Sequence, residues 1–224
     1  MRTGQFPRLL AIIDADVAAR AGWSAPDLAR AYLDGGARFL QVRAKHLPSG
    51  AFLELCDEIV GLAGSGAAVI VNDRADLARL AGAAGVHLGQ SDLPPVLAHQ
   101  VRGARATDGQ ASTDTPWVVG LSTHSVAHVE AALREPVSYI AVGPVFGTST
   151  KDTGYNAVGL SLVSAAAHMA EPMSIVGIGG IRLDSARSVV EAGASAVAVI
   201  TDLLATGDPE ARTKEYLRVL TWPP

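Results

Sequence analysis

The chain has 224 residues, of which 49% are apolar and only 5% aromatic, and its formal net charge is −4. This composition supports one domain of α/β-barrel size or two small ones, and it excludes a disordered chain, which would be poorer in apolar residues. The acidic balance without a Lys/Arg run argues against nucleic-acid binding, and a single cysteine, Cys56, excludes an internal disulfide framework or a cysteine metal cluster.

The N-terminal apolar run is short and is broken by Asp14 and Asp16. It lacks the hydrophobic region and cleavage pattern of a signal peptide, and no later stretch is long and apolar enough to span a membrane. We therefore expect a cytoplasmic protein without membrane association.

Short β-rich runs alternate with longer helical runs along the chain. Strands are predicted over residues 9–14, 39–43, 68–72, 85–88, 117–122, 139–143, 174–177 and 196–200. Helices are predicted over residues 24–34, 50–63, 74–81, 94–101, 125–134, 160–169, 184–192 and 209–220. Eight strand–helix units predict an α/β fold, a single (β/α)8 TIM barrel over residues 1–224. Segment 103–116 is polar and is expected to be a flexible surface loop within that domain.

The second predicted strand ends in an alternating polar pattern, in which Gln41, Arg43 and Lys45 are separated by Val42 and Ala44. Alternate residues of a strand point to the same side, so these three side chains are expected to face the barrel mouth. The alternative is a solvated loop with ordinary surface charges.

Polar residues also follow the third and fourth predicted strands, at the barrel end where such folds carry their function. Asp73 follows Asn72, and Asp92 lies a few residues beyond strand four. Mg²⁺ typically takes one or two carboxylates plus water and phosphate oxygens, so the pair predicts a magnesium site. The alternatives are a helix N-cap for Asp73 and a loop carboxylate for Asp92. His87, within a strand, is expected to be a hydrogen-bonded structural residue.

Hydroxyl groups and a lysine follow the fifth and sixth predicted strands. Ser122 either donates its hydroxyl to a phosphate or caps the next helix, and His124 is expected to be structural. Thr148, Thr150 and Lys151 lie in a segment whose hydroxyls and ammonium group suit phosphate binding. The alternative for this segment is a flexible surface loop.

Glycines follow the seventh predicted strand, and a polar residue follows the eighth. Gly179 and Gly180 would let backbone N–H groups approach a phosphate, and Ile200 and Thr201 end the last strand. Phosphate sites after strands seven and eight recur in this fold. Together with the cationic region at strands two to four, this predicts two phosphate-recognising poles and a transfer reaction with diphosphate as leaving group.

These motifs resemble those of the thiamine phosphate synthase family. The matching stretches are 41–45, 72–76, 85–94, 122–124, 143–146, 148–151 and 177–181, in order and at similar spacing along almost the whole chain. The resemblance implies a magnesium-dependent transferase that joins a hydroxymethylpyrimidine diphosphate to a hydroxyethylthiazole phosphate, giving thiamine phosphate and pyrophosphate.

The resemblance also implies roles for individual residues. Mg²⁺ would be held by Asp73 and Asp92. The pyrimidine diphosphate would be held by Gln41, Arg43, Lys45, Asn72, Ser122 and Lys151, of which Arg43, Ser122 and Lys151 are expected to be catalytic. The thiazole phosphate would be held by Thr148, Thr150, Gly180, Ile200 and Thr201.

The chain departs from the family pattern at Ala44, where Glu is usual, and at Gly147, where proline is frequent. A thiazole tautomerase relative is one alternative, although such proteins tend to lack the aspartate pair and the cationic strand-two motif. A non-catalytic phosphate-binding barrel is another. Outer helices of a barrel this small could also support a homo-oligomer.

Overall fold

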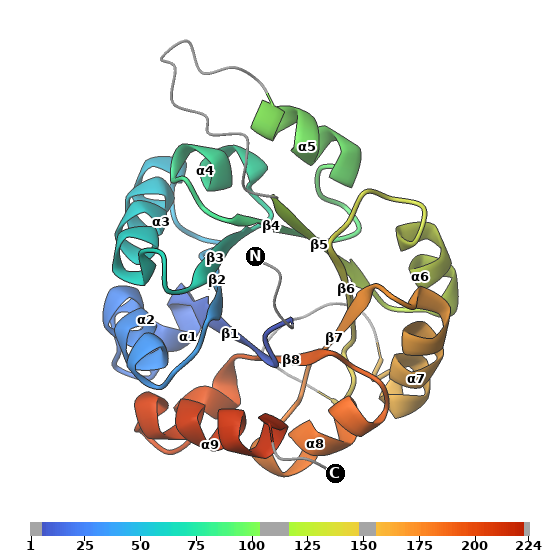
Figure 1. The fold of residues 1–224 in the computed structure, drawn as a ribbon. Helices are drawn as coiled ribbons and strands as arrows, with labels where there is room; N and C mark the ends of the chain where they lie inside the picture. Colours follow the sequence, from blue (N-terminus) through green and yellow to red (C-terminus); the bar gives the residue numbers. More distant parts are fainter. Residues whose placement is uncertain (1–5, 104–116, 148–155, 222–224) are drawn as a thin grey trace.

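Eight parallel strands close into a barrel, each hydrogen-bonded to its sequence neighbours and β8 to β1 (Figure 1). The computed structural model describes residues 6–103, 117–147 and 156–221. The strands are β1 Leu9–Asp14, β2 Phe39–Arg43, β3 Ala68–Asn72, β4 Gly85–Leu88, β5 Val118–Thr123, β6 Tyr139–Val142, β7 Ser174–Ile178 and β8 Ala196–Val199. The predicted (β/α)8 fold is confirmed.

Helices surround the barrel and pack on its outer face (Figure 1). They are α1 Ala15–Arg20, α2 Ala25–Asp34, α3 Ser49–Ala63, α4 Ala75–Leu80, α5 Pro95–Gly103, α6 Val126–Ala132, α7 Gly159–Ala170, α8 Leu183–Glu191, the 3₁₀ helix η1 Thr201–Leu204 and α9 Pro209–Thr221. All eight predicted helices are present, with ends shifted by one or two residues. The expected loop at 103–116 lies outside the described residues except for Gly103, which ends α5.

Two short helices were not predicted. Asp14 ends β1 and caps α1, because its Oδ1 atom accepts a hydrogen bond of 3.0 Å from the Val17 N–H. Segment 201–204 forms η1 directly after β8. Both helices lie at the carboxyl ends of strands, so they shape the rim on which the candidate site is built.

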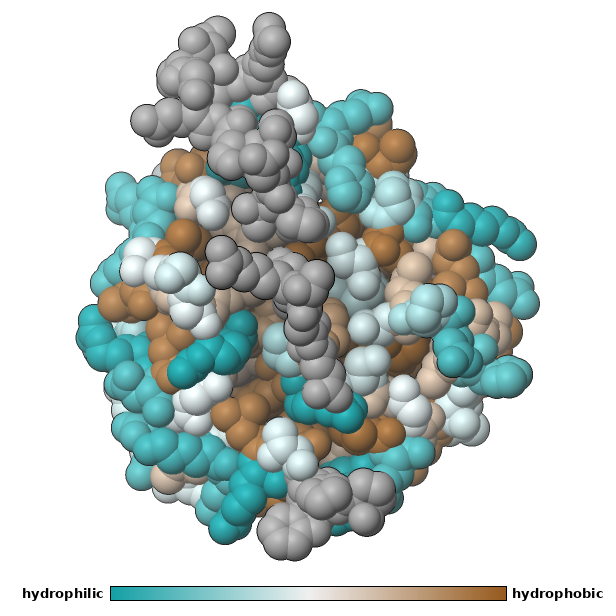
Figure 2. Space-filling view, in the orientation of Figure 1, coloured by the Kyte–Doolittle hydropathy of each residue, from teal (hydrophilic) through white to brown (hydrophobic). Residues whose placement is uncertain are grey.

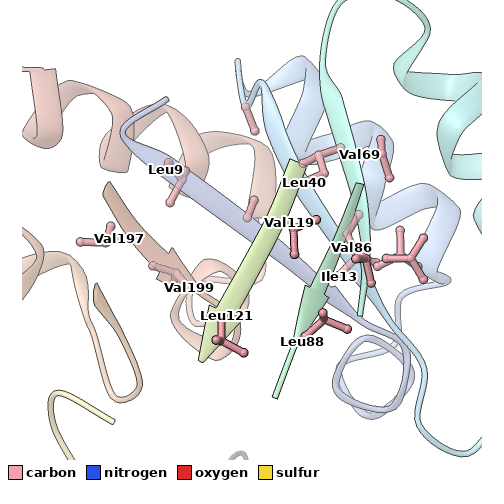
Figure 3. Close-up of a cluster of buried hydrophobic side chains, with 14 of the residues drawn as sticks. Leu9, Ile13, Leu40, Val69, Val86, Leu88, Val119, Leu121, Val197 and Val199 are labelled. Atoms are coloured by element: carbon pink, nitrogen blue, oxygen red, sulfur yellow. The ribbon is translucent and has the colours of Figure 1, made fainter. Parts of the chain in front are cut away.

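The main hydrophobic core lies between the barrel and its helices. Its strand residues alternate with inward-facing ones, as period-two geometry requires. Figure 3 shows part of this layer, to which β1–β5 and β8 contribute Leu9, Ile13, Leu40, Val69, Val86, Leu88, Val119, Leu121, Val197 and Val199. Cys56 of α3 is buried in the same layer, and burial followed by the charge of Asp57 raises the pKa of its thiol to about 12. Cys56 therefore acts as a small buried residue of the core.

A second, smaller core fills the barrel itself. Phe39 and Tyr139 begin β2 and β6, and their rings meet edge to face with centroids 5.9 Å apart. Phe6 contacts both rings. The Tyr139 ring occupies space that a side chain at residue 120 would need, because a Cβ atom on Gly120 would lie 2.1 Å from Tyr139 Cζ. Side chains therefore fill the amino-terminal half of the barrel, so a site can form at the carboxyl end of the strands.

Hydrophilic residues predominate around the circumference of the molecule, over the helices, whereas apolar residues gather nearer the barrel axis (Figure 2). Within the described ranges, the helices are all too short or too polar to cross a membrane.

Candidate functional site

The inward-facing side chains of the first five strands turn from apolar to polar toward the carboxyl end of the barrel. On β2, Phe39 belongs to the inner core while Leu40 and Val42 belong to the outer one, so Gln41 and Arg43 face inward by alternation. We call this set the polar arc; its members are Asp14, Gln41, Arg43, Asn72, His87 and Ser122. The solvated-loop alternative for residues 41 and 43 is wrong, because both lie within β2 and Gln41 is only 2% exposed.

Arg43 is fixed by a buried carboxylate that the sequence motifs did not reveal. Asp14 and Arg43 are partners in the β1–β2 register, and Arg43 Nη1 donates a hydrogen bond to Asp14 Oδ2. The side chains are 12% and 2% exposed for Arg43 and Asp14 respectively. Two buried donors of the arc, Arg43 Nε and Gln41 Nε2, have no hydrogen-bond partner among the described residues. Buried polar atoms normally find partners, so these two donors are available for hydrogen bonds to a ligand.

The two predicted metal ligands meet at the rim. Burial raises the pKa of Asp92, and a hydrogen bond with the Asp73 carboxyl group raises it further. Lys45 Nζ lies 3.0 Å from Asp73 Oδ2, and the Gly89 N–H donates a 2.7 Å hydrogen bond to Asp92 Oδ2. Two carboxyl groups in contact require a proton or a cation between them, so this donor set fits a hard divalent ion.

The conformation of Asp73 is unusual. Among the described residues that are not glycine, it alone has a positive φ, of 65°. The residue does not cap α4, whose N-cap is Arg74 without a side-chain bond, so the N-cap alternative is wrong. Left-handed backbone at a non-glycine residue is costly and gathers at functional sites, and here it turns the carboxylate toward Asp92. Within the described ranges no three His, Cys, Asp or Glu side chains gather, so an ion here would need further oxygen ligands.

A buried hydrogen-bonded chain crosses the barrel interior. His87 Nδ1 lies 2.8 Å from Tyr139 Oη, and His87 Nε2 lies 2.9 Å from Ser122 Oγ. The prediction that His87 is a hydrogen-bonded barrel residue is confirmed. The helix-cap alternative for Ser122 is wrong, because Ser122 lies within β5 and Ser125 caps α6. His124 Nδ1 bonds the carbonyl of Gly143, which ties β5 to the end of β6.

A cavity of about 330 Å³ opens on the other side of the rim, beside Ser122. Its lining includes Gly179 and also Gly180, Ile200 and Thr201, three of the residues that the resemblance assigns to the thiazole phosphate. Gly180 has a φ of 64°, and a Cβ atom there would lie 2.6 Å from the Gly147 carbonyl oxygen. Only glycine fits this turn without strain. We call the cavity-lining set Gly143, Ile178, Gly179, Gly180, Ala198, Ile200 and Thr201 the glycine arc.

Two charged side chains that line this cavity differ in their partners, since Asp202 is paired and Arg182 is not paired with any described residue. Asp202 accepts hydrogen bonds from Leu183 N, Arg212 Nη2 and Tyr216 Oη at 3.0, 2.7 and 2.6 Å. Its charge is thereby neutralised and its position fixed against α8 and α9. Arg182 also lines the cavity, and its guanidinium makes no ion pair with any described residue. Arg182 was not singled out from the sequence, although a cation two residues after the glycine pair was a usable signal.

Three predicted site residues, Thr148, Thr150 and Lys151, lie outside the described residues. Asn72 is 5% exposed at the end of β3, directly beside the Asp73 turn. The remaining predicted residues, Gln41, Arg43, Lys45, Asp73, Asp92, Ser122, Gly180, Ile200 and Thr201, all lie at the carboxyl ends of strands.

The fold and the rim place the chain among the (β/α)8 barrels, with a pocket lined by residues that follow β7 and β8. More narrowly, the chain belongs to the thiamine monophosphate synthase family, whose model matches residues 9–203. The family resemblance predicted from the motifs is confirmed.

Individual relatives agree with this assignment. A thiamine-phosphate synthase from Anaeromyxobacter dehalogenans is 43% identical over 183 residues, which cover 82% of this chain and 77% of that protein. Another, from Koribacter versatilis, is 37% identical over 218 residues, covering 96% and 97% of the two chains. The solved structure of a thiamine phosphate pyrophosphorylase from Pyrococcus furiosus aligns with a TM-score of 0.79 at 26% identity and covers 95% of each chain.

Proposed function

We propose that this chain is a single-domain enzyme that joins 4-amino-2-methyl-5-(diphosphomethyl)pyrimidine to 4-methyl-5-(2-phosphoethyl)thiazole, giving thiamine phosphate and pyrophosphate. The observation that carries the proposal is the pair of carboxyl groups, Asp73 and Asp92, in contact beside Lys45 on the rim that also holds the glycine arc. Family membership and the names of the relatives support the same reaction.

The polar arc suits the diphosphate end of the pyrimidine substrate. Arg43 carries positive charge there and Lys45 follows it two residues later, while the Gln41 Nε2 and Arg43 Nε atoms, which have no partner among the described residues, offer further donors. Mg²⁺ held by Asp73 and Asp92 would supply positive charge against the charge of the departing diphosphate. Preorganised cations at the point where charge develops are the main source of rate in such a site.

In the proposed reaction, the bond between the pyrimidine methylene carbon and the diphosphate oxygen breaks, and its electron pair leaves with the diphosphate. The electron-rich aminopyrimidine delocalises the positive charge left on the carbon. The thiazole nitrogen then forms the new C–N bond. The chain's part is to hold both partners in line and to bind the leaving group, which is an orientation effect, so no protein nucleophile is needed.

The glycine arc suits the thiazole phosphate. Gly180 brings backbone close to the cavity, Thr201 contributes a hydroxyl at the first turn of η1, and Arg182 adds a guanidinium that makes no ion pair with a described residue. We include Thr148, Thr150 and Lys151 in the proposal on the family resemblance alone.

Pyrophosphate release tests the proposal directly. Purified protein should release pyrophosphate when both substrates and Mg²⁺ are present, and omission of any one of the three should abolish release. A thiazole tautomerase or a binding module would give none under any condition, and that result would overturn the proposed function.

A further inference from the structure

The hydrogen-bonded series Tyr139–His87–Ser122 can place its protons in two ways, and the geometry decides between them. His87 lies between two hydroxyl groups, so a neutral imidazole donates to one of them and accepts from the other. In the first arrangement, Tyr139 donates to Nδ1 and the Nε2–H donates to Ser122. In the second, the Nδ1–H donates to Tyr139 and Ser122 donates to Nε2.

The surroundings of Tyr139 decide between these arrangements. Its side chain is fully buried among Phe6, Phe39 and Ala141, and its hydroxyl has no hydrogen-bond partner among the described residues other than His87. In the second arrangement the phenolic proton would have no acceptor in an apolar interior, which costs the desolvation penalty of that group. A doubly protonated His87 imidazole would also leave the phenolic proton of Tyr139 without an acceptor, and it would bury a positive charge as well.

The first arrangement leaves both the phenolic proton of Tyr139 and the imidazole proton of His87 hydrogen-bonded. Burial keeps the pKa of Tyr139 above its usual value, so the phenol retains the proton that it donates. The proton left over is that of Ser122, whose hydroxyl already accepts from His87 Nε2. Ser122 belongs to the polar arc and also lines the rim cavity, so a substrate bound on the polar arc can accept that proton.

We propose that Tyr139 and His87 are positioning residues that fix Ser122 as a hydrogen-bond donor toward the bound pyrimidine diphosphate. Neither reaches the cavity lining itself, so both act through Ser122. The identity of the acceptor rests on the proposed function, whereas the proton positions rest only on the geometry of the free protein.

Nitrogen-15 NMR of the histidine rings in the free protein tests the proton positions. The chain has six histidines, and a His87→Gln variant identifies the resonances of residue 87. We expect a protonated Nε2 and an unprotonated Nδ1, and we expect Tyr139→Phe to shift Nδ1 because it removes the donated proton. A protonated Nδ1, or an Nδ1 unaffected by Tyr139→Phe, would overturn the proposal whatever the reaction of the protein.

A matched pair of substitutions tests the role of Nε2. The Gln amide nitrogen in His87→Gln can reach the Nε2 position and donate to Ser122, whereas the shorter side chain of His87→Asn places its amide near Nδ1. We expect His87→Asn and Ser122→Ala each to lower kcat/KM for the pyrimidine diphosphate roughly tenfold. We expect His87→Gln to stay within about threefold of wild type, since it keeps that donor.

The double variant His87→Asn with Ser122→Ala shows whether the two residues act together. If His87 acts through Ser122, His87→Asn should lower kcat/KM little further in the Ser122→Ala background, because the hydroxyl through which His87 acts is already absent. Independent, multiplicative losses, or equal losses for His87→Asn and His87→Gln, would overturn the proposal. Thermal unfolding of each variant identifies any loss caused by misfolding, and the wild-type NMR measurement decides the proton positions regardless. A wild-type protein that releases no pyrophosphate would instead count against the proposed function.

Discussion

The polar arc on β1–β5 and the glycine arc on β6–β8 face each other across one rim, yet they are built from different chemistry. The polar arc uses buried side chains that hold each other in place, such as Arg43 on Asp14 and His87 between two hydroxyls. The glycine arc uses backbone conformation, with Gly179 and Gly180 in succession at φ values of 95° and 64°. The first arrangement concentrates charge, whereas the second creates a space that backbone groups can line.

This difference matches the two anions of the proposed reaction. A diphosphate that departs with extra negative charge needs positive charge near it, and Arg43 lies on the polar arc with the Lys45–Asp73 pair and Asp92 on the same rim. A phosphate that only anchors its substrate needs a shaped pocket with a few donors, which the glycine arc supplies. We therefore expect substitutions on the polar arc to impair departure of the diphosphate and substitutions on the glycine arc to impair binding of the thiazole phosphate.

Asp92→Ala should have the largest effect, because it removes one of the two carboxylates that meet at the polar arc. We expect pyrophosphate release to fall by about 10² or more, the scale for losing a charge-stabilising group. The substitution should leave the fold intact, since Asp92 lies at the rim rather than in the core. Asp57→Asn, on the exposed face of α3, is the matched control and should keep wild-type turnover. Wild-type activity in Asp92→Ala would remove the metal assignment.

Arg43→Met should reduce stability as well as activity, because it leaves the Asp14 carboxylate buried without its cation. We expect the free energy of unfolding, measured by chemical denaturation, to fall by about 3 kcal/mol. Adding Asp14→Asn should restore part of this loss, since it removes the buried charge but keeps an acceptor for the α1 cap. If the double variant is no more stable than Arg43→Met, the ion pair does not hold the arc together.

Gly180→Ala should damage the glycine arc through its backbone. The new Cβ atom would lie 2.6 Å from the Gly147 carbonyl oxygen, in addition to the cost of a left-handed alanine. Gly82→Ala is a matched control, with a φ of 63° but no atom within 4 Å of the added Cβ. We expect Gly82→Ala to cost about 1 kcal/mol of stability and Gly180→Ala about 1–2 kcal/mol more. Equal losses would show that the close packing of this turn does not matter.

Arg182→Gln should have the smallest and most selective effect. We expect KM for the thiazole phosphate to rise about tenfold while KM for the pyrimidine diphosphate changes little, because one charged hydrogen bond is lost at one pole. Arg187→Gln, within helix α8 whose N-cap is Arg182, replaces an arginine that pairs with Glu191 at 2.8 Å and should behave like wild type. A rise in KM for both substrates would contradict the separation of the two arcs.

The strand pattern was predictable because parallel strands buried on both faces are short apolar runs between helices, such as residues 68–72. The short helices α1 and η1 were not predicted, since six and four residues carry no helical periodicity. The meeting of Asp73 with Asp92 was predictable from their positions after neighbouring strands. The Asp14–Arg43 pair and the Tyr139–His87 contact were not, because they depend on strand register and on barrel closure.

A crystal structure of the protein with Mg²⁺, pyrophosphate and thiamine phosphate tests the central claim most directly. We predict one metal ion between Asp73 and Asp92, pyrophosphate against Arg43 and Lys45, and the phosphate of thiamine phosphate beside Gly180 and Thr201. Pyrophosphate bound at the glycine arc, or an ion that contacts neither aspartate, would contradict the division of the rim into two anion-binding arcs.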